Sequence, residues 1–302
     1  MKVLISTSSF AEFDRAPLEA LTKADIVYTL NPHGRKLNND ELLGLAVGMD
    51  GLIAGTETLT ATIIKQLPGL RVISRCGAGM DNVDLVAAKE QGINVFNTPD
   101  APTQAVAELT IGLVLNLLRR IGEMDRTIRV GGWKKIMGNL IAGKKVGIIG
   151  FGRIGRKTAD LFAALGCEIG FFDPLIKESI GKNKALTKET LLGWADIVTI
   201  HVSGSQQVIG TTELAIMKQG AWLINVARGG VVDEQALYEN LKNGRLAGTA
   251  IDVFSQEPYN GPLLELANVI VTPHIGSYAK EARIKMEMEA VSNLLKGLEV
   301  AQ

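Results

Sequence analysis

Three side chains that could share one acid–base reaction follow three apolar runs in the second half of the chain. AWLINVA is followed by Arg228, GTAIDVF by SQEP with Glu257, and NVIVTP by His274, one of only three histidines. A carboxylate beside a histidine fixes the imidazole tautomer and raises its pKa, which makes the ring a useful proton donor and acceptor. An arginine offers a fork that can hold a carboxylate and polarise a carbonyl. Together the three residues suit acid–base chemistry on an acidic substrate.

Each of the three also has a structural explanation. Arg228 could form a surface pair with Asp233, and Glu257 could be a turn residue before a proline. His274 could be a histidine whose hydrogen bonds are satisfied where a strand meets a loop. The strand pattern places all three where open α/β sheets bind ligands, but by itself it leaves the catalytic and structural interpretations open.

GFGRIG, at 150–155, has the spacing of a dinucleotide-binding loop. It lies between a strand and a helix, where Gly150 allows a tight turn, Gly152 lets the backbone approach a pyrophosphate and Gly155 lets the helix pack on the strand. The helix N-terminus would direct amides at the phosphates. Asp173 ends the next strand. A carboxylate there would accept hydrogen bonds from the ribose hydroxyls and repel a 2′-phosphate, which favours NAD over NADP. The alternative is a structural turn followed by a solvated aspartate.

Short β-rich runs alternate with helix-compatible segments in two blocks separated by a helix from about Thr103 to Ile121. The first block has apolar runs at 2–7, 25–30, 51–55, 72–77 and 93–97, and the second has them at 145–150, 168–173, 196–201, 221–227, 248–254 and 268–274. Such alternation predicts an α/β fold with two doubly wound parallel sheets, the second of about six strands. The runs are continuously apolar, so both faces of each sheet are expected to be covered.

The last segment, 279–298, predicts a helix that crosses back onto the first block. Its apolar face would consist of Ile284, Met288, Val291, Leu295 and Leu298. The first domain is therefore predicted to be discontinuous, comprising 1–98 plus 279–302, and the second to comprise 99–278. A cleft is expected between them.

Composition narrows the function classes. The chain has 302 residues, with 32 Lys plus Arg and 32 Asp plus Glu. It therefore has no net charge that would favour binding to nucleic acid or to anionic lipid. Two cysteines cannot form a disulfide framework, and neither has a metal-ligand spacing. The most apolar stretch, 109–118, is too short and interrupted to cross a bilayer. We expect a cytoplasmic protein with no bound metal, no nucleic-acid partner and no membrane contact.

VARGGVVDEQAL, AIDVFSQEP and VIVTPHIGS, with GFGRIG and FFDP ahead of them, resemble the D-isomer-specific 2-hydroxyacid dehydrogenases over nearly the whole chain. The resemblance implies a flavodoxin-like substrate domain, a Rossmann NAD-binding domain and a small 2-hydroxy or 2-keto acid as substrate. It implies that Arg228 binds the substrate carboxylate and carbonyl. His274 would take the hydroxyl proton as hydride leaves for the nicotinamide, and Glu257 would stabilise the protonated imidazole.

The resemblance also implies binding residues around this reaction. Ala78 and Gly79 match a loop whose amides receive the substrate carboxylate, and Asp252 would sit near the nicotinamide carboxamide. The long helix from Thr103 resembles a dimerisation arm, which implies a homodimer. The implied cofactor contacts, in addition to the three loop glycines and Asp173, are Arg153, Ile154, Ala227, Arg228, Asp252 and the loop from His274 to Ser277, including Gly276.

Within this family the chain is most similar to the short forms of the phosphoglycerate dehydrogenase branch, which implies 3-phosphoglycerate as substrate and a role in serine biosynthesis. One departure motivates an alternative. TETLT, at 56–60, replaces a segment where similar enzymes carry a phosphate-binding arginine, and Glu57 would repel phosphate if it faced the substrate. Arg75, Lys134 and Lys135 could supply positive charge instead, or be structural and solvated. The alternatives are a glyoxylate or hydroxypyruvate reductase and, in another class, an NAD-sensing corepressor-like protein.

Overall fold

The structure is a computed structural model that describes residues 1–299. The chain forms two compact units. Unit 1 comprises Met1–Pro102 and the described residues from Ser277 onward, and unit 2 comprises Thr103–Gly276. The units thus divide at 102/103 and 276/277, whereas the sequence places the domain limits at 98/99 and 278/279.

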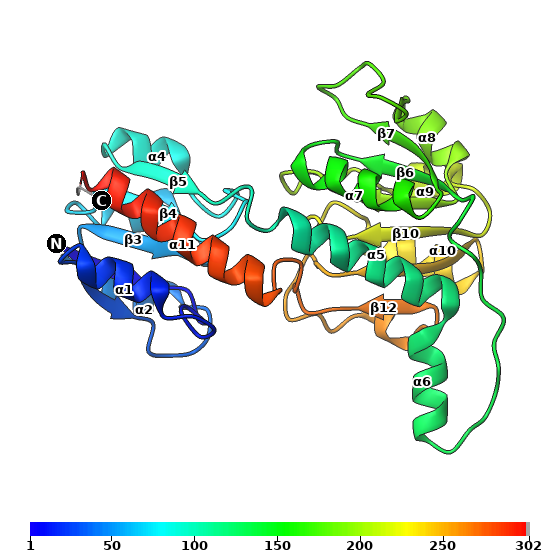
Figure 1. Ribbon diagram of the computed structural model, residues 1–302, viewed down its shortest axis with the longest axis horizontal. Coiled ribbons are helices and arrows are strands. Elements are labelled where there is room, and N and C mark those ends of the chain that lie inside the picture. Colours follow the sequence, from blue (N-terminus) through cyan, green and yellow to red (C-terminus); the bar gives the residue numbers. More distant parts are fainter. Residues whose placement is uncertain (300–302) are drawn as a thin grey trace. The chain divides into compact units, whose positions relative to one another are not determined.

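Unit 1 is built on a five-stranded parallel sheet (Figure 1). Its strands are β1 (Lys2–Ile5), β2 (Val27–Leu30), β3 (Gly51–Ala54), β4 (Val72–Arg75) and β5 (Asn94–Asn97). Their order is β2-β1-β3-β4-β5, so the winding reverses between β1 and β3, as expected for a flavodoxin-like sheet. The middle strands are buried on both faces, which confirms the interpretation of their continuous apolar runs.

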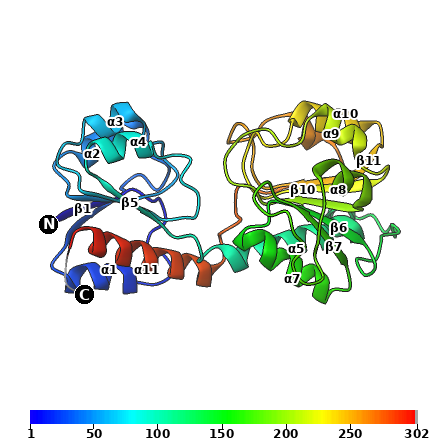
Figure 2. The ribbon, with the colours of Figure 1, turned by 90° about the horizontal axis from the view of Figure 1, so that it is seen from above.

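Helices cover both faces of this sheet. They are α1 (Ala16–Lys23), α2 (Asn39–Ala46), α3 (Ala61–Lys65), α4 (Leu85–Glu90) and α11 (Lys280–Gly297). In Figure 2, α1 and α11 lie on one face and α2, α3 and α4 on the other, which matches the two separate apolar clusters of this unit. The Ser74 hydroxyl of β4 donates to the Ala290 carbonyl of α11 at 2.7 Å, so the last helix of the chain is fixed to the first sheet.

The buried face of α11 differs from the predicted one in its first half. Met288 is 37% exposed, whereas Met286 and two charged residues, Arg283 and Glu287, are buried. The apolar pattern did not predict this buried face, because charged side chains occupy two of its positions. They neutralise each other there, since Arg283 Nη2 lies 2.8 Å from a Glu287 carboxylate oxygen.

Unit 2 contains a seven-stranded parallel sheet in the order β12-β11-β10-β9-β6-β7-β8. The strands are β6 (Lys145–Ile149), β7 (Glu168–Phe172), β8 (Lys184–Ala185), β9 (Ile197–Ile200), β10 (Ala221–Asn225), β11 (Leu246–Ile251) and β12 (Val269–Val271). The order is that of a Rossmann sheet with one further strand, β12, at its edge. The prediction of about six strands missed only β8, which is two residues long and has no apolar run.

The helices of unit 2 also form two layers. They are α5 (Thr103–Arg119), α6 (Ile121–Arg129), α7 (Arg153–Ala164), α8 (Lys188–Trp194), α9 (Thr211–Ile216) and α10 (Glu234–Lys242), with a short 3₁₀ turn, η1 (Pro262–Glu265). One layer contains α5 and α7, and the other contains α8, α9 and α10 (Figure 2). The helix predicted to run to Ile121 ends at Arg119, because Arg120 adopts a left-handed φ of 51° and α6 starts a new direction.

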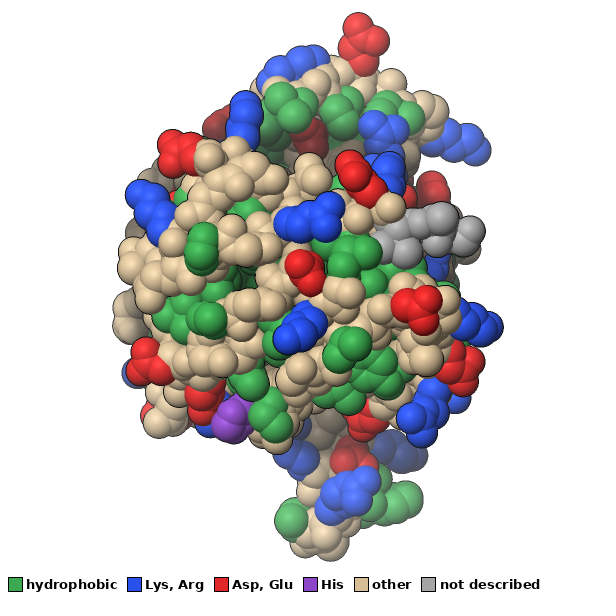
Figure 3. All heavy atoms as spheres, turned by 90° about the vertical axis from the view of Figure 1, so that its left-hand side faces the viewer, with side chains coloured by type: hydrophobic (Ala, Val, Ile, Leu, Met, Phe, Trp, Pro, Cys, Tyr) green, Lys and Arg blue, Asp and Glu red, His purple; other side chains and the backbone are tan. Residues whose placement is uncertain are grey.

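Within residues 1–299, no helix is both long and apolar enough to cross a membrane. The same residues hold no group of three or more His, Cys, Asp or Glu side chains placed to bind a metal ion. On the molecular face drawn in Figure 3, basic and acidic side chains are interspersed.

Candidate active site

The three glycines of the loop between β6 and α7 have different surroundings. A Cβ at Gly155 would lie 2.1 Å from the Gly150 carbonyl oxygen, so only glycine lets α7 pack this closely on the end of β6. Gly150 has a φ of 92°, in the region that favours glycine. A Cβ at Gly152, in contrast, would meet no described atom within 4 Å. The loop is therefore tight at both ends and open in the middle.

The first turn of α7 starts at this opening. Gly152 is the N-cap residue and supplies no side-chain oxygen, so no side chain of its own caps the helix N-terminus, whose positive dipole end favours an anion. Asp173, after β7, accepts hydrogen bonds from the backbone amides of Phe151 at 2.8 Å and Leu175 at 2.9 Å. Its carboxylate is thereby fixed beside the glycine loop and retains lone pairs for ribose hydroxyls. These features fit the pyrophosphate and the adenosine ribose of a dinucleotide.

Three further predicted contacts lie in this unit, two of them within the glycine loop itself. Arg153 is exposed and Ile154 is half-buried, both in the first turn of α7. Ala227 is buried just after β10, where its amide donates to the Asn225 side chain at 3.1 Å.

His274 and Glu257 form the pair that the sequence suggested. The imidazole Nδ1 lies 3.1 Å from Glu257 Oε2, and both side chains remain partly exposed, at 45% and 37%. The other oxygen of Glu257 accepts from the Phe254 amide at 3.1 Å, which fixes the carboxylate. Because Nδ1 faces the carboxylate, Nε2 is the ring nitrogen left for a substrate. The pair can therefore accept and return a proton.

Arg228 lies on the loop after β10, next to the loop that leads to Glu257. Gly229 makes this close packing possible, since a Cβ there would lie 1.8 Å from the Phe254 carbonyl oxygen. The guanidinium Nη1 donates to the Ala227 carbonyl at 2.7 Å, and the Asn225 side-chain Nδ2 donates to the Arg228 carbonyl at 3.0 Å. The backbone of the arginine loop is thus held on both sides.

Asp252, just after β11, holds the loop that contains His274 in place through hydrogen bonds. Its carboxylate is fully buried and accepts hydrogen bonds from the Thr272 hydroxyl at 2.6 Å and from the Ile275 and Gly276 amides at 2.8 and 2.9 Å. The His274 amide donates to the Asp252 carbonyl at 2.9 Å. These bonds hold His274 at a φ of 56°, a left-handed conformation that non-glycine residues adopt at some cost. Burial raises the pKa of Asp252 despite its three donors.

In unit 1, the loop after β4 contains Ala78 and Gly79. Both residues are half-buried, and within residues 1–299 their amides donate to no protein acceptor. The Ala78 carbonyl instead accepts from the Asn97 side chain at 2.7 Å. Adjacent amides without protein acceptors form a place where an anionic group can bind.

A family model described as D-isomer specific 2-hydroxyacid dehydrogenase, NAD binding domain, matches residues 111–276. The chain belongs to this family of dehydrogenases. The match confirms the predicted family, enzyme class and cofactor, NAD, and it covers the glycine loop and all three candidate catalytic residues.

Individual relatives of this dehydrogenase agree on the family but not on the substrate. The chain is 37% identical over 279 residues to a D-3-phosphoglycerate dehydrogenase of Archaeoglobus fulgidus, in an alignment that covers 87% of this chain but only 53% of that protein. It is also 37% identical over 272 residues to a hydroxypyruvate reductase of Thermotoga maritima, covering 87% of this chain and 89% of that protein. The chain thus spans about half the length of the first relative.

Solved structures confirm the two-domain α/β fold of the dehydrogenase. A crystal structure of a Thermus thermophilus protein matches with a TM-score of 0.92 at 35% identity, covering 99% of this chain and 97% of that chain.

Glu57, which the sequence left as a possible source of repulsion if it faced a substrate, points inward. It is buried, 2% exposed, and its carboxylate accepts hydrogen bonds from the Ser6 hydroxyl and from the Gly55 amide, the latter at 2.9 Å. It ties the end of β1 to the loop after β3. Its carboxylate is therefore an internal structural acceptor, and the expected repulsion of a phosphate loses its basis.

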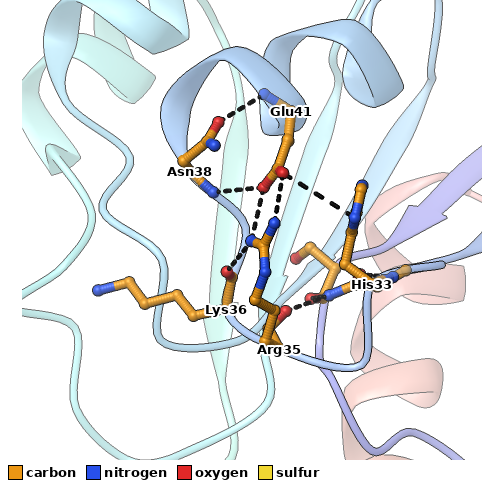
Figure 4. Close-up of polar contacts among 7 residues, drawn as sticks. His33, Arg35, Lys36, Asn38 and Glu41 are labelled. Carbon is orange, nitrogen blue, oxygen red and sulfur yellow. Dashed lines mark hydrogen bonds and ion pairs between the residues drawn. The ribbon is translucent and has the colours of Figure 1, made fainter. Parts of the chain in front are cut away.

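The two other histidines of the dehydrogenase are accounted for by their surroundings. His33 lies in the surface cluster of Figure 4, where Glu41 pairs with Arg35 at 2.6 Å and lies 3.9 Å from the His33 ring. His201 follows β9, and burial lowers its pKa to about 3, so it stays neutral at physiological pH. The sequence did not reveal the organising role of Asp252 or the close approach at Gly229, although the GG pair after Arg228 was a signal for the latter.

Proposed function

We propose that this protein interconverts a D-2-hydroxy acid and its 2-keto acid with NAD. The observation that carries the proposal is the His274–Glu257 pair, 3.1 Å apart, in the same unit as an open glycine loop and a fixed Asp173. NAD, when bound, supplies the hydride acceptor, and its reduced form supplies the hydride donor. The protein supplies the proton transfer and the binding of the acid.

In the direction of oxidation, His274 takes the hydroxyl proton on Nε2, since Nδ1 already faces Glu257. The imidazole becomes positively charged at that moment, and the neighbouring carboxylate stabilises this form. In the direction of reduction, the same nitrogen returns the proton to the developing alkoxide. Asp252 contributes by holding the histidine loop, so it is a positioning residue in this scheme.

The carboxylate of the substrate needs hydrogen-bond donors from the protein. Arg228 provides a guanidinium that can pair with the carboxylate and polarise the adjacent carbonyl. Unit 1 contributes the amides of Ala78 and Gly79, which have no protein acceptor within the described residues. Units 1 and 2 would thus serve as the substrate and NAD-binding domains.

For the substrate we propose 3-phosphoglycerate and its oxidised form, 3-phosphohydroxypyruvate, with a role in serine biosynthesis and a cytoplasmic location. The phosphoglycerate dehydrogenase relative supports this choice, and the internal position of Glu57 removes the main argument against it. The absence of any arginine or lysine from TETLT favours the second candidate, hydroxypyruvate or glyoxylate, which the hydroxypyruvate reductase relative supports.

One assay separates these candidates. NADH oxidation by the purified protein is followed with 3-phosphohydroxypyruvate, hydroxypyruvate and glyoxylate at matched concentrations. A higher kcat/KM for the phosphorylated acid supports the first candidate, and a higher value for either small acid supports the second. NADH binding without turnover of any of them would contradict the enzymatic proposal and favour an NAD-sensing binding protein.

A homodimer is part of the proposal because unit 2 carries an apolar surface without cover. In the segment that follows α6, Val130, Trp133 and Met137 are 85%, 83% and 92% exposed. The segment is anchored, since the Asn139 amide donates to the Leu118 carbonyl at 2.8 Å. Large exposed apolar side chains on an anchored segment are typical of an interface. Light scattering after chromatography should show a dimer, and Trp133→Glu should shift it to monomer.

A further inference from the structure

The Arg75 side chain, at the end of β4, packs against Gly77, in the loop that also contains Ala78 and Gly79. A Cβ at Gly77 would lie 1.4 Å from Arg75 Nη1 and 2.6 Å from Arg75 Cζ, so the guanidinium occupies the space that any other side chain at position 77 would need. Gly77 also has a φ of 150°, a conformation that side chains with a Cβ rarely adopt. The distances show that the guanidinium packs against the backbone of this loop, and the backbone angle independently favours glycine at position 77.

The guanidinium also orients the loop backbone. Arg75 Nη1 donates to the Cys76 carbonyl at 2.7 Å, while the Gly77 amide donates to the Thr98 hydroxyl at 2.8 Å. These bonds fix the Cys76–Gly77 peptide group at both its carbonyl and its N–H end. The next two amides, those of Ala78 and Gly79, are the ones that find no acceptor among residues 1–299. The guanidinium therefore lies against Gly77, immediately before two amides that are open to an anion.

We propose that Arg75 is a positioning residue for the substrate carboxylate, an inference that rests on the proposed function. It fixes the Cys76 peptide so that the amides of Ala78 and Gly79 face a ligand, and its charge strengthens the attraction of these amides for an anion. Because the carboxylate is common to all 2-keto acids, the effect is the same for phosphorylated and unphosphorylated substrates. The proposal also explains why position 77 is a glycine.

The test measures KM and kcat for hydroxypyruvate, glyoxylate and 3-phosphohydroxypyruvate in wild type, Arg75→Met and Arg75→Lys. Losing a charged hydrogen bond and its field should raise KM by about 10- to 100-fold in Arg75→Met, with kcat changed by less than about threefold because the reacting groups are intact. Arg75→Lys should recover part of the loss, since it keeps the charge but not the fork. The fold-change should be equal for the three acids.

Gly77→Ala provides a second, independent variant. The added methyl group displaces the guanidinium, which is the far end of a flexible side chain, so KM should rise although the charge is retained. In the double variant with Arg75→Met, KM should rise no further than in the stronger single variant, because both changes remove the same contact. NADH affinity, measured by fluorescence, serves as the control and should be unchanged in every variant.

Several results would overturn the inference. An unchanged KM in a folded Arg75→Met variant would make Arg75 a purely structural residue, as would a loss of kcat and NADH affinity in parallel with KM. A KM increase confined to 3-phosphohydroxypyruvate would assign Arg75 to the phosphate instead. Wild-type protein that reduces none of the three acids would overturn the proposed function itself, and the inference with it, whereas wild-type turnover with an unaffected Arg75→Met variant would overturn the inference alone.

Discussion

Replacing Gly152 by alanine should separate cofactor binding from folding. Its backbone is extended, with φ −75° and ψ −156°, which alanine can adopt, and the new methyl group would meet no described atom within 4 Å. The cost to the free energy of unfolding should therefore be below about 1 kcal/mol, mostly from alanine being a poorer N-cap than glycine. The methyl group would, however, occupy the opening where a pyrophosphate approaches the backbone. NADH affinity should fall at least tenfold, or about 1.4 kcal/mol.

Gly155→Ala is the matched control, because it inserts the same methyl group three residues away. There the Cβ would lie 2.1 Å from the Gly150 carbonyl oxygen, and the end of β6 and the start of α7 would have to separate. Overpacking of this kind costs about 1–3 kcal/mol of folding free energy. Urea unfolding and NADH fluorescence titration measure the two quantities. Wild-type NADH affinity in a folded Gly152→Ala variant would refute the assignment of this loop to the pyrophosphate.

Three other changes test the remaining parts of the site. His274→Ala should lower kcat by about 10²- to 10⁴-fold and leave the Kd for NADH unchanged, and wild-type turnover would rule out its acid–base role. Asp173→Asn should weaken NADH binding and reduce the preference for NADH over NADPH, since the amide lacks the charge that repels a 2′-phosphate; a preserved preference, measured as the ratio of kcat/KM values, would argue against a ribose contact. Burial raises the pKa of Asp252, so its contribution to stability is present below the unfolded pKa of about 3.9 and is lost as pH rises through the folded value. Asp252→Asn should therefore flatten the fall of unfolding free energy with pH in that window, and identical urea-derived pH slopes in both proteins would contradict this.

Most of the fold could be predicted because a buried parallel strand is apolar along its whole length. The central strands of both sheets carry this signal, and the βα turn at GFGRIG identified which sheet binds the dinucleotide. The elements that were missed lack the signal. β8 has only two residues, and α6 has no buried residue, so neither shows the periodicity of an element that packs on a core. The break at Arg120 depends on a single left-handed residue that no pattern marks.

The residues of the candidate site were easier to find than the directions in which they point. Glu257 and His274 follow different strands, and the parallel order of β11 and β12 is sufficient to bring the loops after them together. Sequence position alone could not distinguish Glu57 from them, since it too is a carboxylate just after a buried strand. The Ser6 hydroxyl and the Gly55 amide decide the matter by offering this carboxylate two internal donors. The end of a strand therefore predicts which polar residue lies at the edge of the sheet. The hydrogen-bond donors of neighbouring loops then determine whether its side chain points inward or remains available to a substrate.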